Sequence, residues 1–290
     1  MNSLVLKDLN NKKRHILKKE KPEYLPFLKW AGGKQWLSKV IKTLLPRDFK
    51  GNYFEPFLGS ASIFFSLKPL NAILSDVNSD LIKTYKSLQD DVERVINELE
   101  KYKNDYDFFI RIRNNTPRKE HLIGARLIYL NKTSFNGLYR VNKNGKFNVP
   151  FGNYSNPTIC NKERLKTASI LLKSAKLFIA DFEKGIEEAS RGDFIYFDPP
   201  YVTTHYNNGF LKYNTHLFSW KDQIRLCEVA KSLAQEGAKV LISNAYHIKL
   251  RNLYDQFYQY KVERNSLISG SSEHRKIVPE ILISSYPLAE

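Results

Sequence analysis

Residues 194–201 read FIYFDPPY, and this stretch decides how the rest of the sequence is interpreted. The apolar run 194–197 is typical of a buried strand, and the two prolines after Asp198 end the strand and remove two backbone donors. The carboxylate, free carbonyls and the ring of Tyr201 therefore lie at a strand's carboxyl end, where open α/β sheets bind ligands. Acceptors beside a stacking face suit a planar base with an amino group, although an ordinary strand-ending turn also fits this short motif.

A second informative pattern lies upstream. We expect a short strand, a tight turn, a helix and a further strand at residues 53–57, 58–62, 63–67 and 72–75. Gly59 lets the backbone approach a ligand closely, just before a helix amino terminus. Asp76 follows 17 residues later, near the separation of about 20 at which an acid binds ribose hydroxyls in dinucleotide folds. The pattern indicates an adenosine-bearing ligand, with helix capping as the alternative role of Asp76.

Two departures from known phosphate motifs narrow this ligand. Ala61 stands where the dinucleotide fingerprint has its second glycine, which disfavours close passage of a pyrophosphate. The segment 32–34, Gly-Gly-Lys, lacks the four-residue spacer and the Ser or Thr of a P-loop. A nucleoside without phosphates fits both departures.

The composition limits the class of protein. With 290 residues, 42% hydrophobic and 26% charged, the chain is expected to form one large α/β domain with an inserted lobe, or two modest domains. No apolar run is long enough for a membrane helix, and the lysine-rich start lacks the features of a secretory signal, so a cytoplasmic protein is expected. Cys160 and Cys227 stand alone without metal-type spacing and are interpreted as structural thiols.

The charge points to a polyanionic partner. There are 46 basic and 30 acidic residues, which leaves a formal net charge of +16. Such a balance favours nucleic acid, with an acidic membrane surface as the lesser option. Charge alone does not identify the polymer.

The pattern of elements changes in the middle of the chain. From 79 to 166 the sequence is helical in character and dense in Lys, Arg, Asn and Tyr, with a hairpin signal at Asn144-Gly145 between Val141 and Phe147. We interpret this block as an inserted lobe. Alternating α/β elements are then expected at 175–180, 194–197, 220–235, 239–243, 258–262 and 281–285.

Six segments stand in the order found in one known family. They are FLKWAGGK at 27–34, FEPFLG at 54–59, SDVNSDLI at 75–82, FNGLYR at 135–140, FNVPFG at 147–152 and DPPY at 198–201. Over about residues 27–286 the chain resembles the Dam-like DNA adenine N6-methyltransferases, a D12 class family in the alpha group of amino-methyltransferases.

The resemblance implies an α/β fold: a Rossmann-like S-adenosylmethionine-dependent methyltransferase sheet with an inserted, mainly helical target-recognition domain. It implies S-adenosylmethionine as the cofactor, adenine in double-stranded DNA as the substrate, and no metal. Residues 26–78 and 167–290 are then expected to form the catalytic domain and 79–166 the DNA target-recognition domain, after a basic flexible extension at 1–25. Ala61 departs from the family's glycine motif and bears on cofactor affinity.

By this resemblance the reacting residues are Asp198, Pro199, Pro200 and Tyr201. The 6-amino nitrogen of adenine is a poor nucleophile because its lone pair is delocalised into the ring, so attack on a sulfonium methyl needs hydrogen-bond acceptors. Asp198 and the Pro199 carbonyl would supply them, and Tyr201 would stack on a base flipped out of the duplex. Alignment of nitrogen, methyl and sulfur carries much of the rate.

The resemblance also assigns cofactor contacts. The matching residues are Trp30, Lys34, Glu55, Phe57, Gly59, Asp76 and Asp198. Trp30 and Lys34 would flank the methionine part, and Asp76 would bind the ribose. A core position for Trp30, a solvated helix start for Lys34 and a merely orienting role for Glu55 remain as alternatives.

A third set matches the family's DNA interface. It consists of Lys29, Phe135, Asn136, Leu138, Arg140, Asn142 and Pro150. Arg140 is expected to read a guanine because its planar fork can bond both major-groove acceptors, and Phe135 is expected to wedge between bases. Core positions for Phe135 and Leu138, and a phosphate contact for Arg140, are the alternatives.

Other charged residues have no specific assignment. DNA-backbone contacts or a solvated face are expected for Arg111, Arg113, Arg118, Lys132, Lys143 and Lys146. The single histidines are interpreted as structural or surface residues: His205, His216 and His274.

The leading hypothesis is a site-specific adenine methyltransferase acting on duplex DNA. By resemblance the target is GATC, while related members read extended sites such as GATATC. The enzyme would be the protective half of a restriction-modification system, in which a cognate endonuclease acts on the same site without a stable complex. A cytosine amino group, RNA or a protein glutamine amide remain alternative acceptors, and a catalytically silent DNA-binding module is the alternative from another class.

Overall fold

The computed structural model describes residues 24, 26–38, 40–46, 49–201, 218–265 and 277–288. The expectations for residues 1–23 and for His205, His216 and His274 lie outside these described residues. No helix within the described ranges is both long and apolar enough to cross a membrane.

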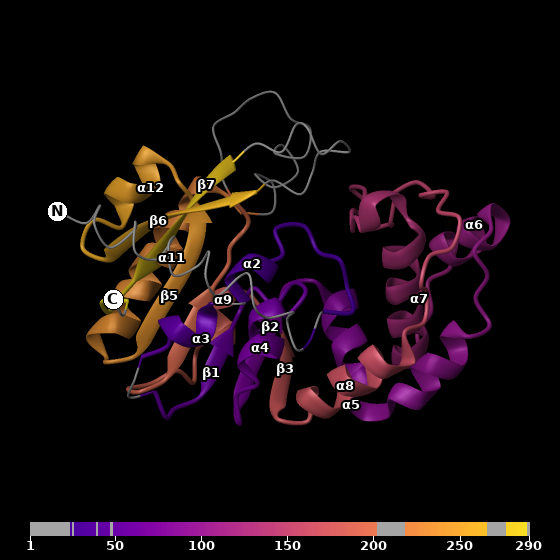
Figure 1. The fold of residues 1–290 in the computed structure, drawn as a ribbon, viewed down its shortest axis with the longest axis horizontal. Helices are drawn as coiled ribbons and strands as arrows, with labels where there is room; N and C mark the ends of the chain where they lie inside the picture. Colours follow the sequence, from indigo (N-terminus) through magenta and orange to yellow (C-terminus); the bar gives the residue numbers. More distant parts are fainter. Residues whose placement is uncertain are drawn as a thin grey trace.

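A mixed sheet forms the centre of the fold (Figure 1). Its strands lie in the order β3-β2-β1-β4-β5-β7-β6. Their bounds are β1 Tyr53–Glu55, β2 Ala72–Asp76, β3 Ala175–Ile179, β4 Phe194–Phe197, β5 Lys239–Ala245, β6 Tyr258–Asn265 and β7 Ile277–Ser284. The pairs β1–β2, β1–β4, β2–β3 and β4–β5 are parallel, whereas β7 pairs antiparallel with both β5 and β6. Each of the strands expected from the sequence is present.

The strand order creates a switch point between β1 and β4. From β1 the chain continues to its neighbour β2, and from β4 it continues to β5 on the opposite side. The connections therefore leave the two central strands in opposite directions, and a crevice at their carboxyl ends is where such sheets bind ligands. Asp198 directly follows β4, so the fold places it at the carboxyl end of that strand, beside the switch point.

The strands β1, β2, β4 and β5 are buried on both faces, which explains why they read as largely apolar runs. In β4, Phe194 and Tyr196 belong to one buried cluster, and Ile195 and Phe197 belong to a second. The same alternation occurs in β1, where Tyr53 belongs to the first cluster and Phe54 to the second. The period of two along each strand thus divides the core into two layers, one on each face.

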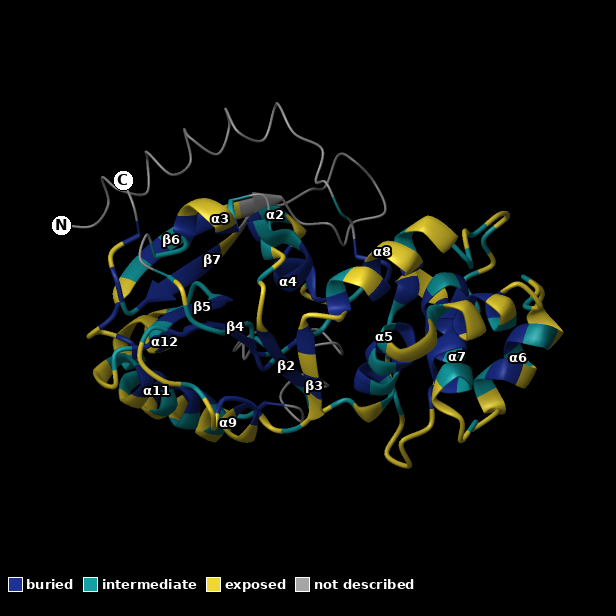
Figure 2. Cartoon of the chain, turned by 90° about the horizontal axis from the view of Figure 1, so that it is seen from below, coloured by how far each residue is buried: buried dark blue, intermediate teal, exposed yellow. Residues whose placement is uncertain are grey.

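Helices cover both faces of the sheet (Figure 2). One layer contains α9 (Phe182–Gly185), α11 (Trp220–Gln235) and α12 (Ile248–Leu253), and the other contains α2 (Gln35–Ser38), α3 (Ile41–Leu44) and α4 (Ser62–Leu67). The helix expected at 220–235 has the predicted bounds. A capping box at Ser219 and Asp222 begins it, because each side chain accepts a hydrogen bond from the other residue's backbone.

A mainly helical segment connects β2 to β3. It contains α5 (Ser79–Leu99), α6 (Tyr106–Asn114), α7 (Glu120–Thr133), the 3-10 turn η1 (Phe135–Gly137) and α8 (Lys162–Leu172). Helix α5 packs on α7, on α8 and on the sheet, so it joins the helical part to the strands. A non-helical backbone at Asp91 kinks α5.

The hairpin signal in this segment corresponds to a real turn. Val141 and Phe147 form an antiparallel bridge, and Gly145 has a φ of 71°. Asn142 closes the turn, because its Oδ1 accepts hydrogen bonds from the backbone nitrogens of Asn144 and Lys146, both at 3.0 Å.

The seven-stranded sheet and the helices around it agree with the α/β fold class predicted from the sequence.

Candidate active site

The carboxylate of Asp198 is the centre of a polar cluster at the end of β4. Its Oδ1 lies 2.7 Å from Lys34 Nζ and accepts a hydrogen bond from Ser243 Oγ at 2.8 Å. Ser243 Oγ is in turn 2.9 Å from the hydroxyl of Tyr196. Burial raises the pKa of Asp198 above its usual value, although Lys34 and Ser243 oppose this shift.

Lys34 and Tyr201 complete this cluster. The Lys34 side chain is only 3% exposed, its Nζ also donates to the Gly32 carbonyl at 2.8 Å, and it lies 4.7 Å from the centroid of the Tyr201 ring. The Tyr201 hydroxyl donates to Glu280 Oε2 at 2.9 Å. Lys34 is therefore a buried partner of the Asp-Pro-Pro-Tyr motif, which excludes a solvated helix start.

The two prolines separate the carboxylate from the ring. Pro199 is buried and Pro200 is half-buried. They end β4 at Phe197, since neither has a backbone N–H for a strand ladder. Asp198, which precedes the proline pair in the sequence, and Tyr201, which follows it, both contact the ammonium group of Lys34.

The glycine turn after β1 is held by the next strand. Gly59 has a φ of 46°, and its backbone nitrogen donates to Asp76 Oδ2 at 3.1 Å. Its carbonyl accepts a hydrogen bond from the Tyr85 hydroxyl at 2.8 Å. A Cβ at this position would lie 2.9 Å from Trp30 Cδ1, so only glycine permits the indole to pack here.

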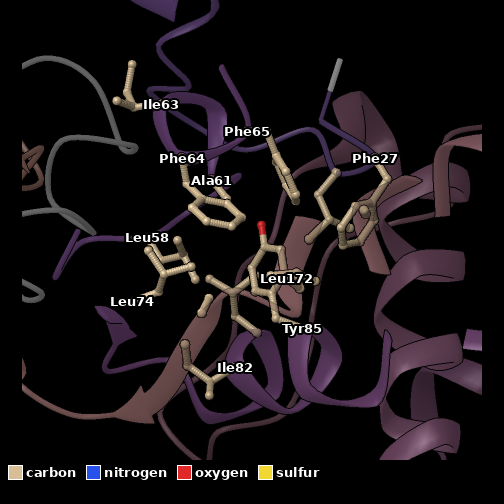
Figure 3. Packing of buried hydrophobic residues seen from close by; sticks show 14 of the residues in the cluster. Phe27, Leu58, Ala61, Ile63, Phe64, Phe65, Leu74, Ile82, Tyr85 and Leu172 are labelled. Carbon is tan, nitrogen blue, oxygen red and sulfur yellow. The ribbon is translucent and has the colours of Figure 1, made fainter. Parts of the chain in front are cut away.

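Helix α4 and α5 support this turn from below. Tyr85 of α5 reaches up among Ala61, Phe64 and Phe65 (Figure 3). Ala61 is fully buried and has a φ of 54°, in the left-handed region that favours glycine. The departure from the family's glycine motif thus retains the glycine-like backbone.

Asp76 does not cap the helix that follows it. The N-cap of α5 is Asn78, whose Oδ1 accepts a hydrogen bond from Leu81 N at 3.1 Å. Asp76 Oδ1 instead accepts from Asn78 N at 2.9 Å, and its side chain is half-buried. The capping alternative for Asp76 is therefore wrong.

Glu55 lies beneath the turn and is 3% exposed. Its Oε2 accepts hydrogen bonds from the Tyr53 hydroxyl at 2.8 Å and from the backbone nitrogen of Phe64 at 3.0 Å. Burial raises the pKa of Glu55 to about 8, although these two hydrogen bonds oppose the shift. The contacts show that Glu55 orients the first turn of α4.

Phe57 belongs to an aromatic group beside the turn. Its ring stacks on Phe182 with centroids 5.5 Å apart and meets Phe218 and Phe197 edge-on. It is half-buried. An aromatic wall of this kind suits a planar ligand at the carboxyl ends of β1 and β3.

Trp30 connects the glycine turn to the helical segment. Its ring stacks on Tyr139 with centroids 5.4 Å apart and an interplanar angle of 25°. The neighbouring Lys29 is tied to α7, because its backbone nitrogen donates to Asn131 Oδ1 at 2.8 Å and its carbonyl accepts from Asn131 Nδ2 at 2.7 Å. The indole is half-buried and packs against the core where the glycine turn meets the helical segment.

The loop after α7 presents the expected DNA-binding side chains. Phe135 is 53% exposed, so the core alternative for this residue is wrong. Its backbone nitrogen donates to the carbonyl of the exposed Pro150 at 2.9 Å. Asn136 has a φ of 55°, and its backbone nitrogen donates to the Tyr154 hydroxyl at 2.8 Å. Leu138 is half-buried against the core.

Arg140 is exposed and is held by its hairpin partner. Its Nε donates to Asn148 Oδ1 at 2.8 Å, and its Nη2 donates to the Asn148 carbonyl at 3.3 Å. Lys29 is also exposed, with Nζ 5.7 Å from the Tyr154 ring centroid. Lys132 differs from the expectation of a solvated face, because its Nζ donates to the Phe27 carbonyl and burial lowers its pKa to about 8.

The sequence interpretation did not identify Ser243, Glu280 or Asn131. Ser243 and Glu280 are fully buried polar residues within strands, in the runs VLISNA and PEILIS. A polar side chain inside an otherwise apolar strand is a signal that it has a buried partner. The sequence does not reveal that the partners are Asp198 and Tyr201.

Fold and site together define a class of protein. A parallel sheet with one antiparallel strand, a glycine turn held by an acid at the end of the next strand, and Asp-Pro-Pro-Tyr after the fourth strand are the features of an α/β amino-methyltransferase. Within the described ranges, no group of three or more His, Cys, Asp or Glu side chains is arranged to hold a metal ion.

Residues 30–268 match the model of the D12 class N6 adenine-specific DNA methyltransferases, and the chain belongs to this family. It is 36% identical over 282 residues to the type II methyltransferase M1.LlaDCHI of Lactococcus lactis subsp. cremoris, covering 94% of this chain and 99% of that protein. It is 38% identical over 288 residues to the type II methyltransferase M.MjaIII of Methanocaldococcus jannaschii, covering 91% and 100%. A DNA adenine methylase of Vibrio cholerae is 33% identical over 263 residues, covering 88% and 94%.

Proposed function

We propose that this enzyme transfers a methyl group from S-adenosylmethionine to the exocyclic amino nitrogen of an adenine that has been flipped out of duplex DNA, within the sequence GATC. The observation that carries this proposal is the cluster of Asp198, Lys34 and Tyr201 at the switch point of the sheet. Because its substrate is DNA, the enzyme is proposed to act in the compartment that holds the chromosome, which in a bacterium is the cytoplasm.

The residues of the glycine turn fit the cofactor. Asp76 uses one backbone hydrogen bond on each carboxylate oxygen, which leaves acceptor capacity on both for the two ribose hydroxyls. The ring of Phe57 would stack on the adenine of the cofactor. Trp30 packs against Gly59, which has no side chain to block the turn. Bound in this way, S-adenosylmethionine supplies an electrophilic methyl group.

Asp198 and the Pro199 carbonyl accept the hydrogens of the target amino group. Among the described residues, the hydrogen bonds and the ion pair of Asp198 all meet Oδ1, from Lys34 and Ser243. This arrangement orients the carboxylate and leaves Oδ2 for the amino group. Tyr201 would stack on the base. The nitrogen–methyl bond would form as the sulfur–methyl bond breaks, and the methylated nitrogen would then release its extra proton to water.

The segment 79–166 is proposed to recognise the target. Phe135 is exposed on a loop whose backbone is fixed by Pro150 and Tyr154, as a side chain that wedges into a duplex must be. Arg140 is exposed and braced by Asn148, which presents the guanidinium fork for a guanine. Lys29, Leu138 and Asn142 lie on the same or adjoining loops.

The names of two relatives support a proposal about the biological role. Two relatives are named type II methyltransferases, a term for the modification half of restriction-modification systems. We propose that this enzyme likewise protects its host against an endonuclease that cleaves the same site and forms no stable complex with it.

Two measurements test the proposal. Methylated plasmid DNA, digested to nucleosides and weighed, should contain N6-methyladenine, and 4-methylcytosine in its place would overturn the acceptor. Methylation mapped across a genome that expresses the enzyme should mark GATC throughout. An extended motif such as GATATC would overturn the target while leaving the reaction intact.

A further inference from the structure

Glu280 is an unusual residue for the interior of a sheet. It lies on β7, paired with Ala245 of β5 on one side and with Val262 of β6 on the other, and it is 1% exposed. Taking a carboxylate out of water is costly, and an apolar side chain of similar volume is usually at least as stable in such a place. A glutamate buried here therefore needs a polar partner.

The carboxylate meets the catalytic motif. Glu280 Oε2 accepts the hydrogen bond of the Tyr201 hydroxyl at 2.9 Å. Burial raises the pKa of Tyr201 well above its usual value, and Glu280 raises it further, so the phenol remains a donor. Tyr201 comes directly after two prolines, and its side chain is thus fixed at one end by a rigid backbone and at the other by Glu280.

The geometry also fixes which way the ring faces. The Tyr201 ring presents a face to Lys34 Nζ at 4.7 Å from its centroid, and the same Nζ lies 2.7 Å from Asp198 Oδ1. The Lys34 ammonium therefore links one face of the ring to the Asp198 carboxylate, and this contact sets the plane of the ring relative to Asp198. A phenol that lost its anchor could rotate the ring about χ1 and χ2 and carry the base away from Asp198.

We propose that Glu280 is a positioning residue that sets the plane of the Tyr201 ring, and thereby holds the target base in line with Asp198. This inference rests on the proposed function, since it needs a base stacked on Tyr201. Glu280 would act on the base through the Tyr201 hydroxyl. Its effect belongs to the methyl-transfer step, because small misplacements of reacting groups cost rate more than affinity.

The test is a mutant cycle measured by single-turnover methylation of a GATC duplex. Glu280→Met removes the acceptor at similar volume, Tyr201→Phe removes the donor, and Glu280→Gln keeps an amide oxygen that can accept. Loss of one hydrogen bond in the reacting geometry should slow Glu280→Met and Tyr201→Phe by about 10-fold each. The double variant should be no slower than either single one, and Glu280→Gln should recover most of the rate. The dissociation constant for S-adenosylmethionine should not change in any of them.

Three results would overturn the inference. They are a wild-type rate in Tyr201→Phe, multiplied losses in the double variant, and an equal loss in Glu280→Gln and Glu280→Met. The Tyr201→Phe result decides the matter even if Glu280→Met does not fold. Failure of the proposed function is distinguishable, because wild-type enzyme would then leave no N6-methyladenine in the duplex.

Discussion

At the scale of single residues, the close contact between Gly59 and Trp30 has a measurable consequence. Gly59→Ala adds a methyl group 2.9 Å from the indole and places alanine at a φ of 46°. A left-handed alanine costs about 1 to 2 kcal/mol by itself, and the displaced indole should add to this and weaken cofactor binding. Thermal unfolding and calorimetric titration with S-adenosylmethionine measure the two effects.

Gly145→Ala is the matched control for this substitution. Gly145 also has a positive φ, of 71°, but a Cβ there would meet nothing within 4 Å. It should therefore show the backbone cost without any loss of cofactor affinity. Equal cofactor affinity in the Gly59 and Gly145 variants would contradict the assigned role of the turn.

The buried carboxyl of Glu55 predicts a pH dependence of stability. Its pKa is raised from an ordinary value of 4.5 to about 8, so between these limits the folded chain retains a proton that the unfolded chain releases. Stability must therefore fall as the pH rises from about 5 to 8, by up to about 1.4 kcal/mol per pH unit. Glu55→Gln should flatten this slope in urea unfolding measured across that range. A slope identical to wild type would show that Glu55 titrates normally.

The residue scale also shows where sequence interpretation ends. Asp198 and Tyr201 are recognisable because proline pairs and strand ends leave a pattern in consecutive residues. Ser243 and Glu280 contact them from strands 45 and 79 positions away in the chain. Their role depends on the order of strands in the sheet, and one sequence does not encode that order as a local signal.

At the scale of elements, the junction between β2 and α5 contains two residues, separated by one position, that perform different functions. Asp76 fixes the Gly59 turn, whereas Asn78 caps the helix. Asn78→Ala should destabilise the fold by about 1 kcal/mol and leave cofactor affinity nearly unchanged. Asp76→Asn should weaken S-adenosylmethionine binding in calorimetry with a smaller loss of stability. The reverse pattern would show that Asp76 is the structural residue.

The hairpin around Gly145 carries a prediction about specificity. Arg140→Ala should lose about 1 to 3 kcal/mol of discrimination between the preferred duplex and one with its guanine replaced. Arg111 is also exposed, and Arg111→Ala is the control for a backbone contact. It should weaken both duplexes equally in a binding titration. Equal weakening by Arg140→Ala would make that residue a phosphate contact as well.

Local signals explain which elements were predictable. Helix α11 has the expected bounds, because Ser219 and Asp222 begin it and Gly237 follows its end. The helical segment was recognisable only as a block, and its division into α5, α6, α7 and α8 was not. The kink at Asp91 and the Trp30–Tyr139 stack depend on packing between distant parts of the chain.

At the scale of the whole molecule, the sheet brings together two patterns that lie far apart in the sequence. The glycine turn follows β1, and the Asp-Pro-Pro-Tyr motif follows β4, which is the parallel neighbour of β1. The groups proposed to bind the adenosine and the target amino group therefore lie at the carboxyl ends of two neighbouring strands. The helical segment leaves the sheet between β2 and β3 and contacts the turn through Tyr139 and Trp30.

The central claim is that Asp198 is the acceptor that makes methyl transfer possible. The most direct test is single-turnover methylation of a GATC duplex by Asp198→Ala, at saturating S-adenosylmethionine, with thermal unfolding and duplex binding measured on the same preparation. The account predicts a folded protein that retains much of its cofactor and DNA binding and whose methyl-transfer rate falls by at least about 100-fold. Turnover close to wild type would contradict it.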